Sequence, residues 1–190
     1  MNKEDLLRNI ADTGYNVGFG AKKHFATYDI VAKVPGNLGF VSIAIGIFAL
    51  YIDLLSTKHL SAVFIILGIA GICINQFDKN KDCYADVGSK LTNLYNRLKS
   101  LYYAVKASKS DDLSDFKNEL TYIECEYNQI CISEQILFAD WYAHYKFFWQ
   151  HQISWIEEQK KFKFFRDKIP LSFMATIVLL ILSIIFSVIV

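Results

Sequence analysis

Several residue types are scarce in this chain of 190 residues, and each scarcity argues against a class of protein. Two prolines and nine glycines are too few for a turn-rich β protein or for a typical disordered one. The 20 basic and 19 acidic residues leave a net charge of +1, whereas a nucleic-acid-binding surface normally needs a clear basic excess. We therefore expect an ordered protein that does not bind nucleic acid directly.

Sequence patterns that carry catalysis or metal binding are also missing. The four cysteines form no CxxC pair, and there is no HExxH, P-loop, nucleophile-elbow or dinucleotide-binding pattern. His144, His151 and Asp140 could share a helix face, but histidines of a core or interface are commoner than metal ligands. We expect no catalytic residue, no metal and no cofactor, and hence no enzymatic activity.

Three long apolar runs dominate what the sequence does contain. Residues 38–55 hold one charge, Asp53, while residues 60–77 and 171–190 hold none. A bilayer core needs roughly 20 helical residues, with about 17–25 as the working range, so each run predicts a transmembrane helix. Four residues separate the first two runs, which predicts a tight helical hairpin. Pro35 and Pro170 precede the first and third runs, where proline suits the first helical turn.

Lysine and arginine are distributed unequally about these predicted spans. The hairpin tip carries Lys58, whereas three basic residues precede the first span, three follow the second and five precede the third. The last five, a juxtamembrane basic group, are Lys160, Lys161, Lys163, Arg166 and Lys168. Because such residues collect on the cytoplasmic side, we expect the N-terminus and residues 78–168 to be cytoplasmic at a bacterial inner membrane.

The sequence thus divides into an N-terminal region 1–37, a hairpin 38–77, a cytoplasmic region 78–168 and a C-terminal span 169–190. In the cytoplasmic region, apolar residues recur at spacings of three and four from Tyr84 to Val105 and again from Leu113 to Phe148. A polar break between them predicts an antiparallel helical hairpin or coiled coil. The fold class is therefore an all-α integral membrane protein with three transmembrane helices.

The two cytoplasmic helices are expected to differ in length. A helix over residues 113–168 would span about 80 Å, against about 40 Å for residues 82–108. The distal half of the longer helix, rich in aromatics, then needs the N-terminal region, the membrane surface or a second subunit as its partner, and burial is favoured over a dedicated partner site. Residues expected to serve cytoplasmic assembly are Leu91, Leu94, Leu98, Leu101, Leu120, Ile123, Tyr127, Trp141, Trp149 and Trp155.

The N-terminal region and the first two spans carry conspicuous small residues. Three glycines within residues 14–20 predict a hinge between two short helices. In the spans, small or polar residues recur on one helix face, which favours helix packing over a water-lined pore; Asp53, near the tip, could reach interfacial water. These packing or pore-lining candidates are Gly39, Ser42, Gly46, Ala49, Asp53, Ser61, Gly68, Gly71 and Asn75.

The order of these features resembles the SLATT group of bacterial membrane effectors. The resemblance rests on the short-loop hairpin after an amphipathic N-terminal segment, on the following cytoplasmic helical hairpin, and on the stretch from Tyr15 to Phe25 that leads through Asp29 to Pro35-Gly36. The simplest members have two spans, and this chain has a third candidate. The resemblance implies a pore-forming effector of phage defence that acts beside a nucleotide synthase or a reverse transcriptase, and it implies no catalytic residues.

Two functions are compatible with the sequence. The first is an oligomeric effector that disrupts or permeabilises the membrane when it is triggered through its cytoplasmic helices. A hairpin and one further helix cannot enclose a pathway alone, so this function requires self-association. The alternative is a passive membrane-anchored coiled-coil scaffold that recruits a cytoplasmic partner, and it predicts that the spans can be exchanged for any other anchor.

Overall fold

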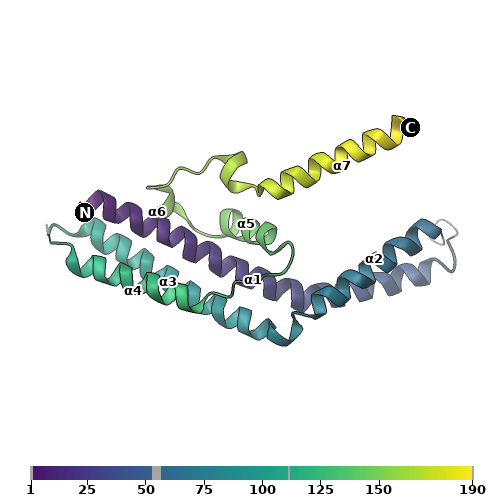
Figure 1. The fold of residues 1–190 in the computed structure, drawn as a ribbon, viewed down its shortest axis with the longest axis horizontal. Helices are drawn as coiled ribbons and strands as arrows, with labels where there is room; N and C mark the ends of the chain where they lie inside the picture. The colour runs from purple at the N-terminus through teal and green to yellow at the C-terminus, as the bar shows by residue number, and fades with distance from the viewer. Residues whose placement is uncertain (1, 53–56, 111, 190) are drawn as a thin grey trace.

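The computed structural model describes residues 2–52, 57–110 and 112–189, and these residues form helices without any strand (Figure 1). The described elements are α1 (Lys3–Phe48), α2 (Lys58–Asn75), a 3-10 turn η2 (Asp78–Asn80), α3 (Lys81–Ala107), α4 (Ser114–Ile130), α5 (Ala139–Gln150), α6 (Ser154–Glu157), a π-helical turn η3 (Phe164–Lys168) and α7 (Leu171–Ile189).

These helices form two kinds of structure. The N-terminal two thirds of α1 pack with α3, α4, α5 and α6 into what we call the helical body. The C-terminal third of α1 pairs with α2 and leaves the body as a hairpin, and α7 leaves from the same end of the body (Figure 1). Along the chain, an apolar helical hairpin is therefore followed by a helical region and by a C-terminal apolar helix, whereas several predicted bounds differ.

Helix α1 is continuous for 46 residues, so the predicted hinge and the predicted pair of short N-terminal helices are wrong. Asn2 caps its start, accepting a hydrogen bond from the Asp5 amide at 2.8 Å. Pro35 lies inside the helix rather than at the start of a span, and the expected boundary at residue 37 falls within α1. Proline removes one backbone hydrogen bond from a helix. Helix α1 is nevertheless continuous, and it packs against the body helices in its N-terminal part and against α2 in its C-terminal part.

The core of the body is the interface between α1 and α3. Every position of the first heptad pattern is buried, namely Tyr84, Val87, Leu91, Leu94, Leu98, Leu101 and Val105. Helix α1 supplies most of the contacts to α3, facing it with Leu6, Ile10 and Val17, while α4 runs back along α3. The periodicity therefore identified the buried face correctly, although its main partner is α1 and not α4.

The long helix expected over residues 113–168 is wrong. Helix α4 ends at Ile130, and residues 131–138 form a non-helical connection that we call the α4–α5 connection. At its end Phe138 adopts a left-handed conformation with φ of 69°, which turns the chain away from the direction of α4. Helix α5 then packs on α1. The distal aromatic segment thus finds its partner in the N-terminal region, one of the three that the sequence left open.

Among the described residues, two helices are long and apolar enough to cross a membrane by length and composition, one in α1 and one that includes α2. Helix α1 ends at Phe48, well before residue 55, and residues 49–52 continue as a turn. Helix α2 starts at Lys58, where the Thr57 side chain accepts from the Leu60 amide. Helix α7 is a shorter apolar helix over its described side chains, and its role as a third span remains a prediction.

Candidate functional site

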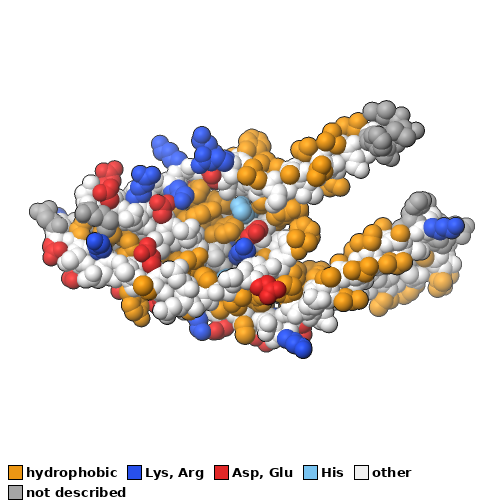
Figure 2. Space-filling model, viewed as in Figure 1, with side chains coloured by type: hydrophobic (Ala, Val, Ile, Leu, Met, Phe, Trp, Pro, Cys, Tyr) orange, Lys and Arg blue, Asp and Glu red, His pale blue; other side chains and the backbone are white. Residues whose placement is uncertain are grey.

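The helices that project from the body are covered with apolar side chains. In Figure 2 these side chains form nearly continuous apolar surfaces over the hairpin and over α7. Ile43 on α1, Ile66 on α2 and Leu179 on α7 are each about two-thirds exposed. Exposed apolar patches on soluble monomers rarely exceed a few hundred Å². These projecting helices therefore present a surface suited to a bilayer or to other apolar helices.

A groove of about 400 Å³ runs between α1 and α2. It brings together five of the predicted packing or pore-lining residues, which are Gly39, Ser42, Gly68, Gly71 and Asn75. A methyl group placed on Gly39, Gly68 or Gly71 would meet no atom within 4 Å. The glycines are therefore not needed for α1 and α2 of one chain to pack, and their faces are open.

The other predicted residues of this set lie elsewhere. Gly46 also has open space around it, but it does not line the groove. Ala49 follows the end of α1, where its amide donates to the Ile45 carbonyl, and Ser61 donates to the Thr57 carbonyl in the first turn of α2. Asp53 lies outside the described residues. The groove is thus built from part of the predicted set.

The residues predicted for cytoplasmic assembly are mostly inside a single chain. Seven of them are buried in the body: Leu91, Leu94, Leu98, Leu101, Leu120, Ile123 and Trp155. Tyr127 packs against that core partly exposed, and Trp141 is half-buried at the base of α7, where its indole N–H donates to Ser172 at 2.9 Å. Trp149 is 61% exposed. Their observed contacts are intrachain, and a role in assembly stays a prediction.

The glycines of the body permit the close approach of aromatic rings to α1. Trp155 lies directly against Gly14, and a methyl group on Gly18 would lie 2.7 Å from Tyr95 Cδ2 and 2.9 Å from Phe147 Cε2. Tyr95 also accepts a hydrogen bond from the Trp155 indole at 2.9 Å. Burial raises the pKa of Tyr95 to about 12. These rings hold α3, α5 and α6 against one face of α1.

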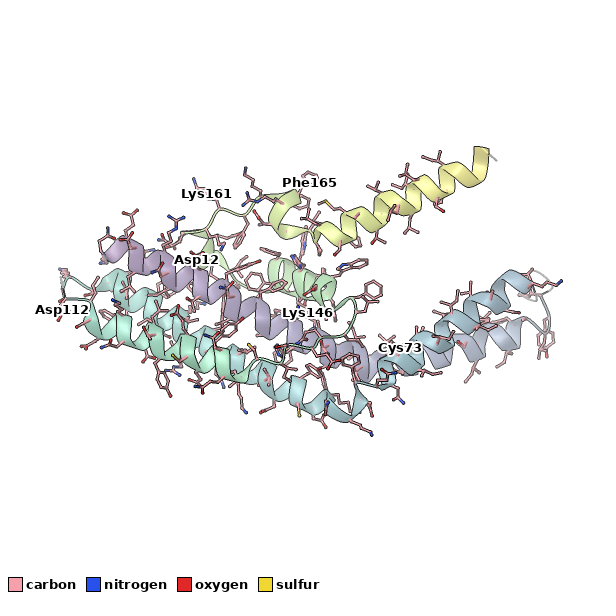
Figure 3. The ribbon with its side chains drawn as sticks, in the orientation of Figure 1. Asp12, Cys73, Asp112, Lys146, Lys161 and Phe165 are labelled. Atoms are coloured by element: carbon pink, nitrogen blue, oxygen red, sulfur yellow. The ribbon has the colours of Figure 1, made fainter. Side chains whose placement is uncertain are left out.

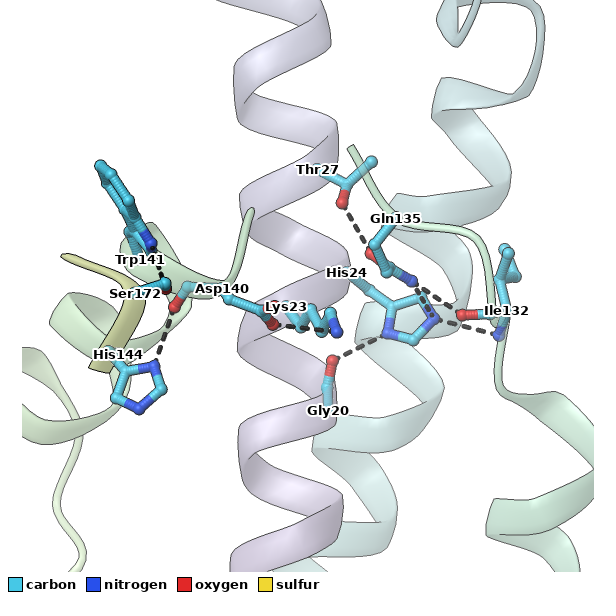
Figure 4. Close-up of polar contacts among 10 residues, drawn as sticks. All are labelled: Gly20, Lys23, His24, Thr27, Ile132, Gln135, Asp140, Trp141, His144 and Ser172. Carbon is cyan, nitrogen blue, oxygen red and sulfur yellow. Dashed lines mark hydrogen bonds and ion pairs between the residues drawn. The ribbon is translucent and has the colours of Figure 1, made fainter. Parts of the chain in front are cut away.

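His24 links α1 to the α4–α5 connection (Figure 4). The Ile132 amide donates to His24 Nε2 at 3.1 Å, so this nitrogen carries no proton. The other nitrogen, Nδ1, then donates to the Gly20 carbonyl at 2.8 Å. Gln135 donates to the Ile132 carbonyl and accepts from Thr27 at 2.6 Å. The ring is therefore fixed as a neutral tautomer, and its interactions position the connection on α1.

The electrostatics of His24 agree with this tautomer. Burial lowers the pKa of His24, and Lys23 lowers it further, against the opposing effect of the hydrogen bond to Gly20. Protonation would place a second donor opposite the Ile132 amide. Lys23 itself pairs with Asp140 at 2.9 Å, at the start of α5 (Figure 4).

A second polar link joins α1 to α5 where the body meets the hairpin. Asp29 pairs with Lys146 and, at 2.7 Å, with Lys33. The Asp29 and Lys146 side chains are only 16% and 14% exposed, and the Lys146 ammonium lies 4.4 Å from the centre of the Tyr142 ring. Burial alone would raise the pKa of Asp29, but hydrogen bonds from Lys146 and Lys33 outweigh it and lower that pKa. This pair is a half-buried contact that joins α5 to α1.

The juxtamembrane basic group divides into paired and unpaired cations. Lys160 pairs with Asp12 at 2.8 Å, and Lys168 pairs with Glu157 at 3.1 Å. Arg166 contacts Asp167 through Nε alone, and its side chain is 71% exposed. Within the described chain, Lys161 and Lys163 are exposed and their ammonium groups make no ion pair.

Sequence reasoning missed the polar links at this junction. His24, Asp29 and Lys146 were not singled out as a set, because the partners of α1 lie more than 100 residues away along the chain. A local signal existed only for Asp29 and Lys33, which are four residues apart and so share a helix face. Within residues 2–52, 57–110 and 112–189, no group of three or more metal-type ligands lies together.

A family model described as SMODS and SLOG-associating 2TM effector domain 6 matches residues 1–177. No curated protein and no solved structure matches the chain significantly. The match spans the body, the hairpin and the first residues of α7.

Proposed function

Because the chain belongs to the SLATT family of two-transmembrane effector domains associated with SMODS and SLOG, we propose that it is a membrane effector of a bacterial anti-phage defence system. When triggered through its helical body, an oligomer of this chain disrupts or permeabilises the inner membrane. The defence partner that supplies the trigger is a nucleotide synthase or a reverse transcriptase.

One observation carries the proposal, namely the continuity of α1 from the body into the hairpin. Leu6, Ile10 and Val17 are buried in the body, while Phe40 and Ile43 on the same helix are exposed and apolar. A helix transmits displacement along its axis because its backbone hydrogen bonds join successive turns. A change in how α1 packs in the body therefore moves the first span directly, without an intervening flexible linker.

The topology follows from the distribution of charge. Basic residues collect where the hairpin and α7 leave the body, which favours a cytoplasmic body. The projecting helices leave the same end of the body (Figure 1), so both can enter one bilayer, with α7 as a third span. The open glycine faces of the α1–α2 groove offer close contact to a helix of another subunit.

The test follows membrane integrity in infected cells that carry the chain with its neighbouring defence genes. We expect infection to depolarise these cells and to admit a membrane-impermeant dye, and cells lacking the chain to exclude it. Replacing residues 38–55 and 60–77 by polyleucine helices should abolish the effect. If infected cells keep their membrane potential, the effector proposal is overturned. If the polyleucine variant still protects cells fully against phage, the passive scaffold is favoured.

The coupling through α1 has its own matched test. A flexible Gly-Gly-Ser-Gly insertion between residues 34 and 35 interrupts α1 between body and hairpin. The same insertion after Ser110 falls in the exposed connection between α3 and α4. We expect the first insertion to abolish dye entry and the second to preserve it. Equal activity of both insertion variants would contradict mechanical coupling through α1.

A further inference from the structure

An exposed aromatic and basic patch lies where the body meets α7. Its members surround the turn η3, and we call them the juxtamembrane patch: Trp149, Lys161, Lys163, Phe164, Phe165 and Arg166. Lys161 and Phe165 are labelled in Figure 3 along the outer edge of the body, with Phe165 beside the base of α7.

The aromatic part of the patch is a cluster of exposed rings. Phe165 is 70% exposed, and Trp149 and Phe164 are about half exposed or more. The Trp149 and Phe164 rings meet edge to face with centroids 6.2 Å apart, and Phe164 meets Phe165 in the same way at 5.2 Å. These rings are exposed, so they are not part of the core of the body. Aromatic side chains at such a position suit the headgroup region of a bilayer.

The cations of the patch are free to bind an anion. The Lys161 and Lys163 ammonium groups form no ion pair among the described residues, although the charge of Lys163 also acts on Asp167, and Arg166 contacts Asp167 through Nε alone. Asp167 is the acid within this turn, and both its oxygens are occupied, one by the Lys163 amide at 2.8 Å and one by Arg166 at 3.0 Å. These hydrogen bonds lower the pKa of Asp167, the one from the Lys163 amide most strongly.

The base of the hairpin has fewer unpaired cations: among its described residues Lys79 is exposed and makes no ion pair. There Lys33, Lys81 and Lys90 pair with acids three or four residues away on the chain, at 2.7–2.8 Å. Each of these cations is thus neutralised locally. Beside α7, two exposed lysines without an ion pair, Lys161 and Lys163, instead lie next to exposed rings and directly before an uncharged helix.

We propose that the juxtamembrane patch binds anionic phospholipid headgroups of the cytoplasmic leaflet. The rings enter the headgroup region beside the first turn of α7, and Lys161, Lys163 and the remaining guanidinium nitrogens of Arg166 bind lipid phosphates. A polybasic segment next to a membrane helix is attracted in this way to an anionic leaflet. Binding fixes the depth of α7 and the tilt of the body over the membrane. This inference rests on the membrane location in the proposed function.

The test uses full-length protein reconstituted into phosphatidylcholine vesicles with spin-labelled phosphatidylglycerol or phosphatidylcholine as tracer lipid. The patch variant K161Q/K163Q/R166Q is compared with K33Q/K81Q/K90Q, which loses the same number of cations at the hairpin base. One cation at an anionic surface changes partition by about fivefold, so we expect the patch variant to lose at least about that factor in phosphatidylglycerol preference. The control variant and wild type should keep it, and raised salt should weaken it.

A second measurement locates the rings independently of charge. Brominated lipids quench tryptophan fluorescence on contact, and Trp155 is buried while Trp149 is exposed. Because Trp141 lies at the base of α7, the comparison is made in a Trp141→Phe background, where we expect quenching with Trp149 present and much less after Trp149→Phe. Equal phosphatidylglycerol preference in the two charge variants, or quenching unchanged by Trp149→Phe, would overturn the lipid-binding inference. Neither result would affect the proposed membrane function. A chain that is not retained in the vesicles would overturn the membrane function on which it rests.

Discussion

The two ends of α1 use glycine in opposite ways. In the body, Gly14 and Gly18 lie under Trp155, Tyr95 and Phe147, and no side chain fits there. In the hairpin, Gly39 and Gly46 have nothing within 4 Å of the position that a methyl group would take. The body therefore completes its packing within one chain, whereas the hairpin leaves its small-residue faces open to lipid or to other helices.

The largest expected effect comes from removing the ring that covers Gly14. Trp155→Ala should lower the free energy of unfolding by about 3–5 kcal/mol, since it leaves a cavity and removes the indole from Tyr95. Thermal unfolding of the full chain in detergent, followed by circular dichroism, measures the change. Trp149→Ala, an exposed counterpart, should shift the free energy of unfolding by less than about 0.5 kcal/mol. Similar losses for both would contradict the assigned packing.

The body glycines themselves give the next largest effect. Overpacking of Gly18→Ala against Tyr95 and Phe147 should cost about 1–3 kcal/mol. Alanine gains roughly 1 kcal/mol over glycine in a helix, so the net destabilisation should reach about 2 kcal/mol. Gly20→Ala is the matched control, because its methyl group would meet Tyr127 and Leu91 at ordinary distances of 3.5–3.6 Å. Thermal unfolding should show opposite signs for the two substitutions, and the same sign would refute this packing.

Lowering the pH should reduce the free energy of unfolding of the body more than that of the hairpin, because the body buries histidine side chains. Burial, with Lys22 and Lys99 nearby, lowers the pKa of His151 from 6.5 to about 4. The unfolded chain therefore binds this proton first, so the stability contribution is complete above pH 6.5 and is lost as pH falls from 6.5 toward 4, by at most about 1.4 kcal/mol per pH unit.

His151→Phe should flatten that part of the pH profile, because phenylalanine can keep the ring contacts to Tyr95 and Phe147. His24, whose pKa is also lowered by burial, should leave a residual slope of the same sign. Unfolding midpoints of wild type and variant between pH 4 and 7 measure the difference. Identical profiles would show that His151 is not the group responsible.

The smallest effect is expected in the hairpin. Gly39→Ala and Gly68→Ala should change the unfolding of the body by less than about 0.5 kcal/mol, because the added methyl groups meet no neighbour within the chain. Tryptophan fluorescence isolates the body, since all three tryptophans lie between residues 141 and 155. A shift as large as that of Gly18→Ala would abolish the distinction between the two ends of α1.

Part of this architecture could be predicted because it depends on local pattern. The spacing of three and four from Tyr84 to Val105 identified a buried face whose every member is buried. The uncharged runs gave the helices α2 and α7 nearly to their ends. Of the candidate membrane residues, Gly39, Ser42, Gly68, Gly71 and Asn75 do line one groove, because residues on one face of a helix stay together when two helices pair.

The errors arose where contacts distant in sequence override local preference. Three glycines within residues 14–20 predict a hinge from helix propensity, yet aromatic rings from α3, α5 and α6 stabilise a straight helix there. The second heptad pattern continues in the sequence, but the chain leaves the helix after Ile130 and places Leu137 74% exposed. The α4–α5 connection is held on α1 by His24, a contact that no local pattern contains.

The sequence by itself determined what each segment is: three apolar helices, a charged helical region, and the faces that α3 buries. These features depend on the composition and on the spacing of apolar residues, and both are visible within a window of about 20 residues. Only the tertiary structure decided that α1 joins body and hairpin in one helix, that Asp29 meets Lys146, and that Lys160 and Lys168 of the juxtamembrane basic group are paired. Each of these depends on which residues meet across the fold, and such contacts join residues far apart in the sequence, as Lys146 and Asp29 show.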